Sequence, residues 1–243
     1  LSFFFHGAGF TGNGEAWLKG KADVELTDCG GVRIFTSSTD IGQGVDTIFP
    51  QLVAQEAGIA IDLVEMAPHD TSDVPDSGPT VASRTTMVVG KVVQEATRRL
   101  VQRIMEISGA TDFQTALGAV RDHPEWPFRT QHTYETKEGI QWDPDAYVGD
   151  AYPCYGWAAD VAVIEVDMDT YETTILDFHT AEDVGKALHP LMVEGQIEGG
   201  TLQGIGYAYL EEVKMQGGAV LNHRMTNCII PTALDAPEIH AYI

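Results

Sequence analysis

Alternating hydrophobic and polar positions mark the first readable part of the chain. Residues 22–26 and 32–36 alternate in this way, and the turn-forming residues 28–31 separate them. A period of two places one face of a strand on a core, so the pattern predicts a β-hairpin. Similar patterns predict the further strands 59–66, 157–166, 173–178 and 239–243, of which 157–166 and 173–178 are expected to form a second hairpin.

In other segments the hydrophobic positions recur every three to four residues, and this spacing predicts helices. We expect a helix at 47–57, a short one at 112–121, a long one that begins near Ser83 and another after Pro190. The hydrophobic positions that keep helical spacing in the helix after Ser83 are Val88, Val89, Val92, Val93, Ala96, Leu100, Val101 and Ile104.

A tight turn at residues 39–46 leads from a strand directly into the helix at 47–57. Gly42 and Gly44 allow a ligand to approach the backbone closely. Gln43 lies between them and offers a hydrogen-bond donor and an acceptor without a charge. The alternative is an ordinary structural turn, because short glycine motifs are weak signals.

The start of the helix at 47–57 is expected to be capped by Asp46, and its end by Gly58. A helix N-terminus presents free backbone N–H groups and the positive end of the helix dipole. The sequence therefore predicts an anion site where the turn meets the helix.

A second polar cluster stands at the start of the long helix. Ser83, Thr85 and Thr86 place hydroxyl groups there, and Arg84 lies among them. Capping explains one hydroxyl, so the cluster predicts a second site for an anion or a polar ligand. The glycine-rich segment 6–15 is expected to be a packed structural loop near a ligand, because it lacks the spacing of nucleotide-binding motifs.

The helix after Pro190 carries Gly195 and Gln196, and then several more glycines. An interior glycine costs about 1 kcal/mol relative to alanine, so a close approach to the helix backbone is expected. Either a ligand or a tightly packed helix would explain this. The other glycines are Gly199, Gly200, Gly204 and Gly206.

Composition excludes several classes of partner. The formal net charge of −22 argues against nucleic acid and anionic membranes. No apolar run approaches the roughly 20 residues that span a bilayer. The 3 cysteines lie far apart, which suits a reduced compartment and rules out a Cys-x-x-Cys cluster framework. None of the 8 histidines has metal-ligand spacing, so no protein metal ligand is predicted.

Several segments together resemble the molybdenum hydroxylases, the family of xanthine dehydrogenase and aldehyde oxidoreductase. Residues 39–44 resemble the glycine–glutamine segment of that family, and residues 77–85 resemble its Ser-Pro-Thr-Ala-Ala-Ser segment. Residues 181–199 are similar to its later pterin-contact helix, and residues 230–238 to the strand region after it. The order and spacing agree over nearly the whole chain.

The resemblance implies a molybdopterin cofactor, as a cytosine dinucleotide in many bacterial members, and hydroxylation of aldehydes or N-heterocycles with oxygen from water. Ile41, Gly42 and Gln43 would contact the pterin or its phosphates, and Gln196 would hydrogen-bond the pterin. The remaining residues assigned to the cofactor site are Gly44, Val81, Ala82, Ser83, Arg84 and Thr85.

The resemblance also implies parts that these residues do not supply. The catalytic glutamate would follow Ile243, and an earlier cofactor domain would precede Leu1. Iron–sulfur clusters and FAD would be carried by an iron–sulfur subunit and a flavin subunit. The expected substrate is a small molecule, and the expected location is the cytoplasm.

We therefore predict an α+β, two-lobed molybdopterin-binding domain with mixed sheets packed against long helices. Residues 1–150 would form the first lobe and residues 151–243 the second. The predicted function is the molybdopterin-binding part of a hydroxylase that acts on a purine-like N-heterocycle or an aldehyde. The alternative is a non-catalytic fragment or an assembly protein that retains the fold.

Overall fold

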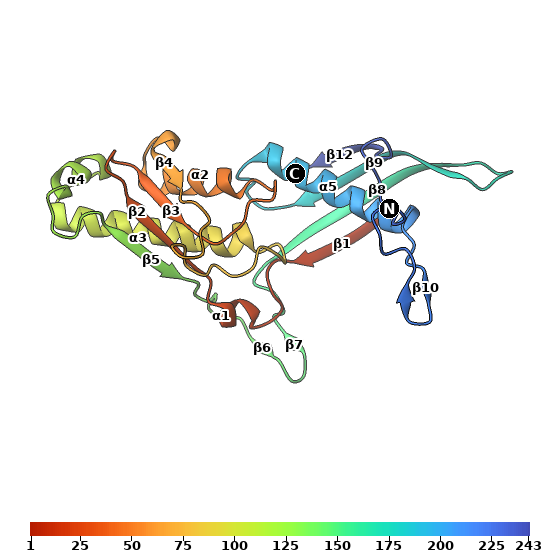
Figure 1. Cartoon of the computed structure of the whole chain (residues 1–243), viewed down its shortest axis with the longest axis horizontal. Helices are drawn as coiled ribbons and strands as arrows, with labels where there is room; N and C mark the ends of the chain where they lie inside the picture. Colours follow the sequence, from red (N-terminus) through yellow and green to blue (C-terminus); the bar gives the residue numbers. More distant parts are fainter. The chain divides into compact units, whose positions relative to one another are not determined.

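The computed structural model describes residues 1–243 as two units (Figure 1). One unit contains residues 7–155, and the other contains residues 1–6 and 156–243. None of the helices is long and apolar enough to span a bilayer. The predicted division into lobes at residues 1–150 and 151–243 stays a prediction, and each unit is described by itself below.

The unit of residues 7–155 is built on a four-stranded sheet with the strand order β4-β3-β2-β5. The β2–β3 and β2–β5 pairs are antiparallel and the β3–β4 pair is parallel, so the first predicted hairpin is confirmed. Ala22, Val24 and Leu26 alternate along one face and are buried. The strands are β2 (Lys21–Leu26), β3 (Val32–Phe35), β4 (Val64–Met66) and β5 (Arg129–Thr133), with a small separate hairpin of β6 (Trp142–Asp143) and β7 (Val148–Gly149).

The strand expected at 59–66 is shorter than predicted. Ile61–Leu63 forms a 3₁₀ turn, and only Val64–Met66 pairs with β3. The Leu63 N–H donates to the Ala60 carbonyl at 3.0 Å, so this segment is still turning after the preceding helix. Hydrophobic composition alone could not distinguish a tight turn from an extended strand here.

Two long helices cover one face of this sheet. Helix α2 packs against α3, and α3 also contacts β2 and β5 (Figure 1). Val88, Val93 and Leu100 are fully buried, as the helical spacing predicts. The helices are α1 (Gly14–Leu18), α2 (Val45–Ala57), α3 (Gly90–Ser108) and α4 (Phe113–Val120), and a single π-helical turn, Thr85–Val89, precedes α3.

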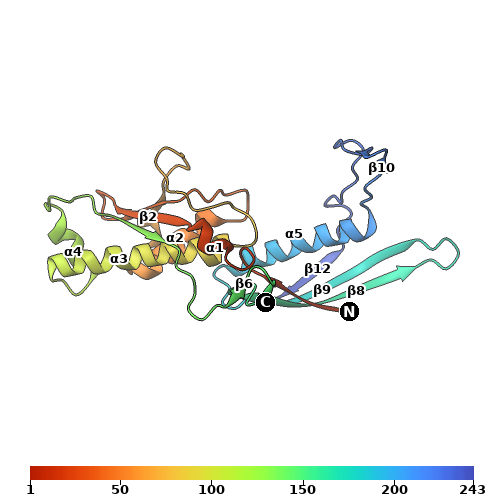
Figure 2. The ribbon, with the colours of Figure 1, turned by 90° about the horizontal axis from the view of Figure 1, so that it is seen from below.

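The second unit is built on another four-stranded sheet, with the order β1-β8-β9-β12. The β8–β9 pair is the second predicted hairpin, and β12 pairs with β9 in parallel. Helix α5 lies along one face of this sheet (Figure 2). The elements are β1 (Ser2–Gly7), β8 (Tyr155–Val166), β9 (Thr173–Asp183), α5 (Pro190–Tyr209), β12 (Glu238–Tyr242) and the short pair β10 (Met215–Gln216) and β11 (Ala219–Val220). Mixed sheets packed against long helices confirm the predicted fold class.

The contact of α3 with the sheet gives the first prediction. Leu100→Ala removes a fully buried side chain, and we expect it to lower the free energy of unfolding by about 2–5 kcal/mol. Gln102→Ala, on the exposed side of the same helix, should change it by less than about 0.5 kcal/mol. Urea denaturation of both variants measures the difference. Equal stability of the two variants would contradict this account of the core.

Candidate cofactor-binding site

Two of the segments predicted to bind a ligand lie side by side. We call residues 36–44 the Gln43 loop and residues 77–85 the Ala82 loop. The Thr39 N–H and hydroxyl donate to Thr80 Oγ1 at 3.0 and 3.1 Å. The Ser37 N–H donates to Ser77 Oγ at 3.0 Å, and the Ser77 N–H donates to Ser37 Oγ at 2.8 Å. The structure thus joins two loops about 40 residues apart in the sequence.

Ser77 anchors this junction in the protein interior. Its side chain is fully buried, and its hydroxyl donates to the Lys21 carbonyl at 2.7 Å. The Thr36 hydroxyl lies 2.8 Å from the Ser77 hydroxyl oxygen. A buried hydroxyl with several partners fixes both loops to the ends of the central strands β2 and β3, because leaving any of these groups unpaired costs about 1–3 kcal/mol.

A buried ion pair between Arg84 and Glu15 anchors the Ala82 loop. The Arg84 guanidinium donates to both carboxylate oxygens of Glu15, from Nε at 2.9 and 3.0 Å and from Nη2 at 3.0 Å. Its Nη1 donates to the carbonyls of Ser77 and Pro79. The Arg84 side chain is 0% exposed and that of Glu15 is 4% exposed. The resemblance assigns Arg84 to the cofactor site, but its side chain is committed to the protein, so only its backbone is available to a ligand.

The glycine-rich segment 7–15 contacts the Ala82 loop directly. The Gly9 N–H donates to the Ala82 carbonyl at 2.8 Å, and the Phe10 N–H donates to Glu15 Oε1 at 3.2 Å. Ala82 and Ser83 both have left-handed backbones, with φ of 57° and 53°. This conformation costs non-glycine residues about 1–2 kcal/mol each, so these contacts hold the loop in a shape that it would not adopt alone.

The Gln43 side chain is oriented by its own loop. Its Nε2 donates to the Thr39 carbonyl and its Oε1 accepts from the Ile41 N–H, both at 2.7 Å. The amide keeps a second N–H and a further lone pair for another partner. The loop therefore presents a fixed, neutral donor and acceptor.

The N-terminus of α2 differs from the prediction. Asp46 is not its cap, because the N-cap residue is Gly44 and no side chain caps it directly. Asp40 folds back instead, and its carboxylate accepts from the N–H groups of Gly42 at 2.8 Å and Asp46 at 3.1 Å. Asp46 turns to His69 Nε2, 3.2 Å away. The prediction of free N–H groups here was wrong, since a carboxylate of the protein already occupies the anion position.

These hydrogen bonds also change the acidity of Asp40. The Gly42 N–H, followed by the Asp46 N–H, lowers the pKa of the Asp40 carboxyl. A carboxylate with a lowered pKa is a weaker proton acceptor. Asp40 is thus suited to holding the turn in shape and poorly suited to acting as a general base.

Apart from the Asp40 carboxylate, the side chains that the two loops leave open carry no charge. Ile41 is 80% exposed and Val81 is 53% exposed, which is unusual for such side chains in a turn. The hydroxyls of Ser83 and Thr86 are exposed and make no hydrogen bond to the protein. Apolar side chains beside neutral hydrogen-bonding groups suit a planar, uncharged heterocycle better than an isolated anion.

Gln196 lies in the other unit, on α5. It is exposed, and a Cβ added at Gly195, Gly199, Gly200 or Gly204 would meet nothing within 4 Å. Tight helix packing explains only Gly206, whose added Cβ would meet Pro231 at 2.5 Å. The other glycines therefore keep a stretch of helix backbone accessible.

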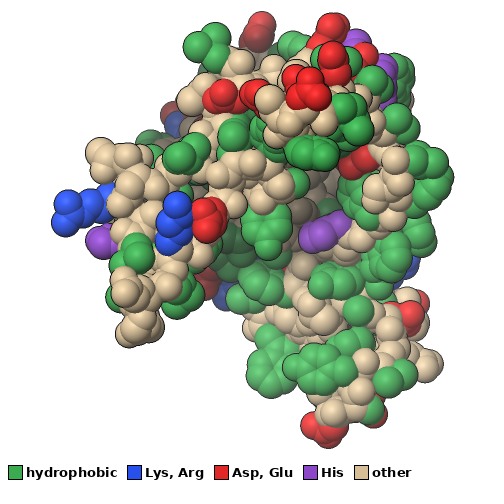
Figure 3. All heavy atoms as spheres, turned by 90° about the vertical axis from the view of Figure 1, so that its right-hand side faces the viewer, with side chains coloured by type: hydrophobic (Ala, Val, Ile, Leu, Met, Phe, Trp, Pro, Cys, Tyr) green, Lys and Arg blue, Asp and Glu red, His purple; other side chains and the backbone are tan.

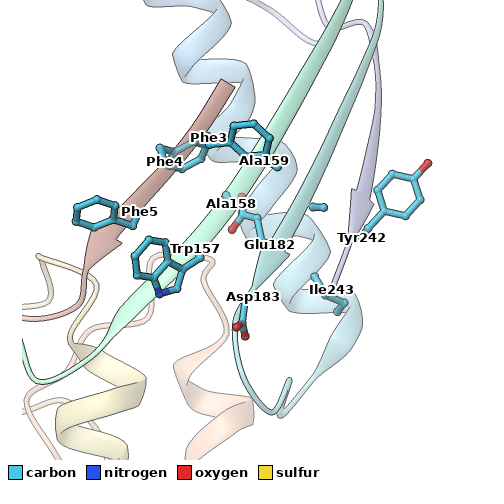
Figure 4. Close-up of a pocket in the computed structure, with 11 residues that line it drawn as sticks. Phe3, Phe4, Phe5, Trp157, Ala158, Ala159, Glu182, Asp183, Tyr242 and Ile243 are labelled. Atoms are coloured by element: carbon cyan, nitrogen blue, oxygen red, sulfur yellow. The ribbon is translucent and has the colours of Figure 1, made fainter. Parts of the chain in front are cut away.

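A groove in the same unit contains none of the predicted site residues. It has a volume of about 580 Å³ and runs over the sheet beside Phe3, Phe5, Trp157 and Tyr242 (Figure 4). The Phe5 and Trp157 rings contact each other at a tilt of 38°, with centroids 4.9 Å apart. In Figure 3, hydrophobic side chains are visible over much of the face, and acidic side chains gather mainly at the upper end of the view.

Sequence reasoning missed Glu15 and Asp40. Glu15 lies at the end of a segment interpreted only as a glycine loop, 69 residues before Arg84. Asp40 lies six residues before the N–H that it accepts from, which is outside the usual capping distance. An arginine among hydroxyls in an otherwise acidic chain was the available signal, and it indicated a buried partner rather than a ligand.

Comparison with known proteins identifies the class of domain. The family model described as the molybdopterin cofactor-binding domain matches residues 1–237. The chain therefore belongs to the molybdopterin cofactor-binding domain family of the molybdenum hydroxylases, as the resemblance predicted.

Individual relatives agree with this assignment. The chain is 29% identical to the 6-hydroxypseudooxynicotine dehydrogenase complex subunit gamma of Paenarthrobacter nicotinovorans, over 90% of this chain and 30% of the relative. It is 26% identical to the xanthine dehydrogenase molybdenum-binding subunit of Escherichia coli O157:H7, over 90% of this chain and 32% of the relative. The crystal structure of quinoline 2-oxidoreductase from Pseudomonas putida 86 superposes with a TM-score of 0.82 at 25% identity, over 99% of this chain and 34% of that chain. The chain thus spans about a third of the length of these proteins.

The buried ion pair gives a second prediction. Arg84→Ala leaves the Glu15 carboxylate buried without its partner, and we expect a loss of about 3–5 kcal/mol in the free energy of unfolding. Arg99→Ala breaks an exposed pair with Glu135 and should cost less than about 1 kcal/mol. Chemical denaturation compares the two. Similar small losses would show that the Glu15–Arg84 pair does not organise the loops.

The Asp40 carboxylate gives a prediction about pH. Because its pKa is lower in the folded state, its charge stabilises the fold above the ordinary Asp pKa of about 4, and this stabilisation is lost as the pH falls through the folded pKa. Asp40→Asn should therefore be less stable than wild type at pH 7, and the gap should narrow as the pH approaches 3.

Urea denaturation across this pH range measures the gap. Asp169→Asn removes one exposed negative charge that makes no side-chain hydrogen bond, so it controls for the general effect of charge. A gap for Asp40→Asn that stays constant with pH would contradict the role of the carboxylate at α2.

Proposed function

We propose that this chain is the molybdopterin-binding part of a molybdenum hydroxylase that oxidises an N-heterocycle or an aldehyde. The observation that carries the proposal is the hydrogen-bonded pair of loops, the Gln43 loop and the Ala82 loop, with their exposed apolar and uncharged polar groups, within a chain whose family binds molybdopterin. The bound cofactor would supply the redox chemistry and the oxygen-transfer chemistry of the reaction.

The residues of the two loops fit the neutral part of such a cofactor. Gln43 offers its free amide N–H and a lone pair, and Ser83 offers an unpaired hydroxyl. Gly42 has a φ of 108° and open space around its Cα, so the backbone there can lie against a flat ring. Val81 and Ala82 would line the floor of the site, and Thr85 begins the π-helical turn behind it.

The phosphate of the cofactor is assigned differently from the sequence-based expectation. The Asp40 carboxylate holds the N–H groups of Gly42 and Asp46, and it would repel a second anion at the N-terminus of α2. We therefore assign the Gln43 loop to the heterocycle and not to a phosphate. Whether the cofactor carries a cytosine nucleotide does not depend on this assignment, and by family analogy we propose the dinucleotide form.

The catalytic base is not proposed among the two loops. Asp40 is the carboxylate of the Gln43 loop, and its lowered pKa disfavours proton abstraction. Glu15 is buried and paired with Arg84. Both acids serve to position the loops, so the base of the reaction would come from another part of the enzyme.

The relatives guide the proposed substrate and partners. Quinoline and xanthine, in the names of two relatives, are N-heterocycles, so we propose a substrate of this class, with aldehydes second. Two relatives are named as subunits, one of them of a complex, and we propose an iron–sulfur subunit and a flavin subunit as electron-transfer partners in the cytoplasm. The isolated cysteines of this chain, Cys29, Cys154 and Cys228, are consistent with clusters carried elsewhere.

Cofactor analysis of the assembled complex tests the proposal. The chain is co-expressed with the remaining molybdopterin-binding segments and the electron-transfer subunits, and molybdenum, pterin and nucleotide are measured. We expect one molybdopterin for each copy of the chain, and dye reduction with N-heterocycles. A folded complex without pterin would instead support a non-catalytic protein that retains the fold.

Gln196 allows a test that separates binding from folding. Its side chain is exposed and makes no hydrogen bond to the protein, so Gln196→Ala should leave the free energy of unfolding within about 0.5 kcal/mol of wild type. Loss of one hydrogen bond to the pterin, about 1–1.5 kcal/mol, should weaken cofactor retention by roughly tenfold. Gln102→Ala on α3 is the matched control. Equal pterin retention in both variants during dilution and dialysis would remove Gln196 from the site.

A further inference from the structure

A cluster of metal-ligating side chains lies on the sheet of the second unit, outside the proposed cofactor site. Asp177 and His179 are two residues apart on β9, so their side chains point to the same face. His240 on β12 pairs in register with His179. Parallel pairing of these strands brings together residues that the sequence separates by about 60 positions.

The ligand atoms of this cluster converge. One atom from each of Asp177, His179 and His240 can be chosen such that all lie within 4.8 Å of one another. Asp177 Oδ1 is 2.9 Å from His240 Nε2, and Asp177 Oδ2 is 3.3 Å from His179 Nε2. The two imidazole rings stack with centroids 4.5 Å apart. Zn²⁺ is bound at about 2.0–2.2 Å in the plane of each imidazole, so the stacked rings would have to turn about their side-chain torsions to coordinate one ion.

The Asp177 carboxylate is left incompletely satisfied by the protein. Its Oδ1 is buried and has no hydrogen-bond partner, although His240 Nε2 is close to it. In the absence of an ion, this oxygen is paired only with the His240 ring 2.9 Å away, and a bound cation would satisfy it.

Neighbouring groups fit a metal site as well. The Tyr242 hydroxyl is 3.3 Å from His179 Nδ1, so it can accept a hydrogen bond from Nδ1–H in the tautomer whose Nε2 is free to bind a cation. Ligating histidines usually make this kind of outer hydrogen bond. Glu238 Oε1 is 3.9 Å from His240 Nε2 and is exposed, so it is within reach as a further oxygen ligand.

We propose that Asp177, His179 and His240 form a binding site for a divalent transition-metal ion of the Zn²⁺ class. Imidazole nitrogens with one carboxylate suit Zn²⁺, Co²⁺ or Fe²⁺ better than Mg²⁺ or Ca²⁺, which prefer oxygen ligands alone. The three side chains are about one third exposed, at 34–35%, so water can complete the coordination. The ion would link β12, at the edge of the sheet, to β9.

The competing interpretation is a metal-free cluster in which the two histidines pair directly with Asp177. That arrangement also brings the rings to the carboxylate, but it gives no saturable affinity for a metal. It also makes the Tyr242 hydroxyl unimportant for any metal affinity. The two interpretations therefore differ in what a titration with Zn²⁺ would show.

Calorimetric titration of the chelator-treated chain with Zn²⁺ tests the proposal, with Co²⁺ absorption as a second readout. We expect one ion for each chain and a rise in Tm on saturation, because a ligand that binds only the folded state stabilises it. Asp177→Asn and His240→Ala should weaken Zn²⁺ binding at least about 100-fold, and Tyr242→Phe about 10-fold. His6→Ala, an exposed histidine in the same unit, is the control and should bind as wild type does.

Circular dichroism checks that every variant is folded, and Tyr242→Phe keeps the test valid if a ligand variant fails to fold. Absence of saturable Zn²⁺ binding by the wild-type chain would overturn the proposal. Equal affinity in wild type, Asp177→Asn and His240→Ala would overturn it too, since the ion would then be bound elsewhere. Neither result bears on molybdopterin binding, which involves other residues.

Discussion

The buried ion pair between Glu15 and Arg84 is the contact on which the candidate cofactor site depends. It connects the glycine-rich segment 7–15 to the Ala82 loop, and the same guanidinium holds the carbonyls of Ser77 and Pro79. Both side chains of the pair are almost completely buried. Burial, followed by the charge of Glu15, raises the pKa of Tyr134. Removing one partner would leave an uncompensated buried charge, so the pair anchors the two segments firmly to each other.

Small residues around this ion pair make it possible. A Cβ at Gly78 would lie 3.0 Å from the Arg84 guanidinium, and Gly78 also has a φ of 78°. The ion pair also fixes the chain next to Ala82 and Ser83, whose backbones are left-handed. Backbone strain of this kind persists only where surrounding contacts fix it, and it is concentrated at functional sites.

Local patterns predicted most of the fold and part of the site. The period-two segments became β2, β3, β8 and β9, and the helical spacing after Ser83 became α3. What could not be predicted depends on contacts between distant residues. The Glu15–Arg84 pair spans 69 residues, and the His179–His240 pairing needs the register of β12 on β9. At the N-terminus of α2, the local capping pattern predicted Asp46 as the cap. In the structure, Asp40 accepts the hydrogen bond from the Asp46 N–H across the glycine turn.

An experimental structure of the chain within the molybdopterin-loaded complex tests the central claim most directly. We expect the heterocycle of the cofactor to lie against the Gln43 loop and the Ala82 loop, with the Gln43 amide as a hydrogen-bonding partner. We also expect Arg84 to remain paired with Glu15 and Asp40 to remain at the N-terminus of α2. A cofactor phosphate bound by the Arg84 side chain, or seated at α2 with Asp40 displaced, would contradict the account.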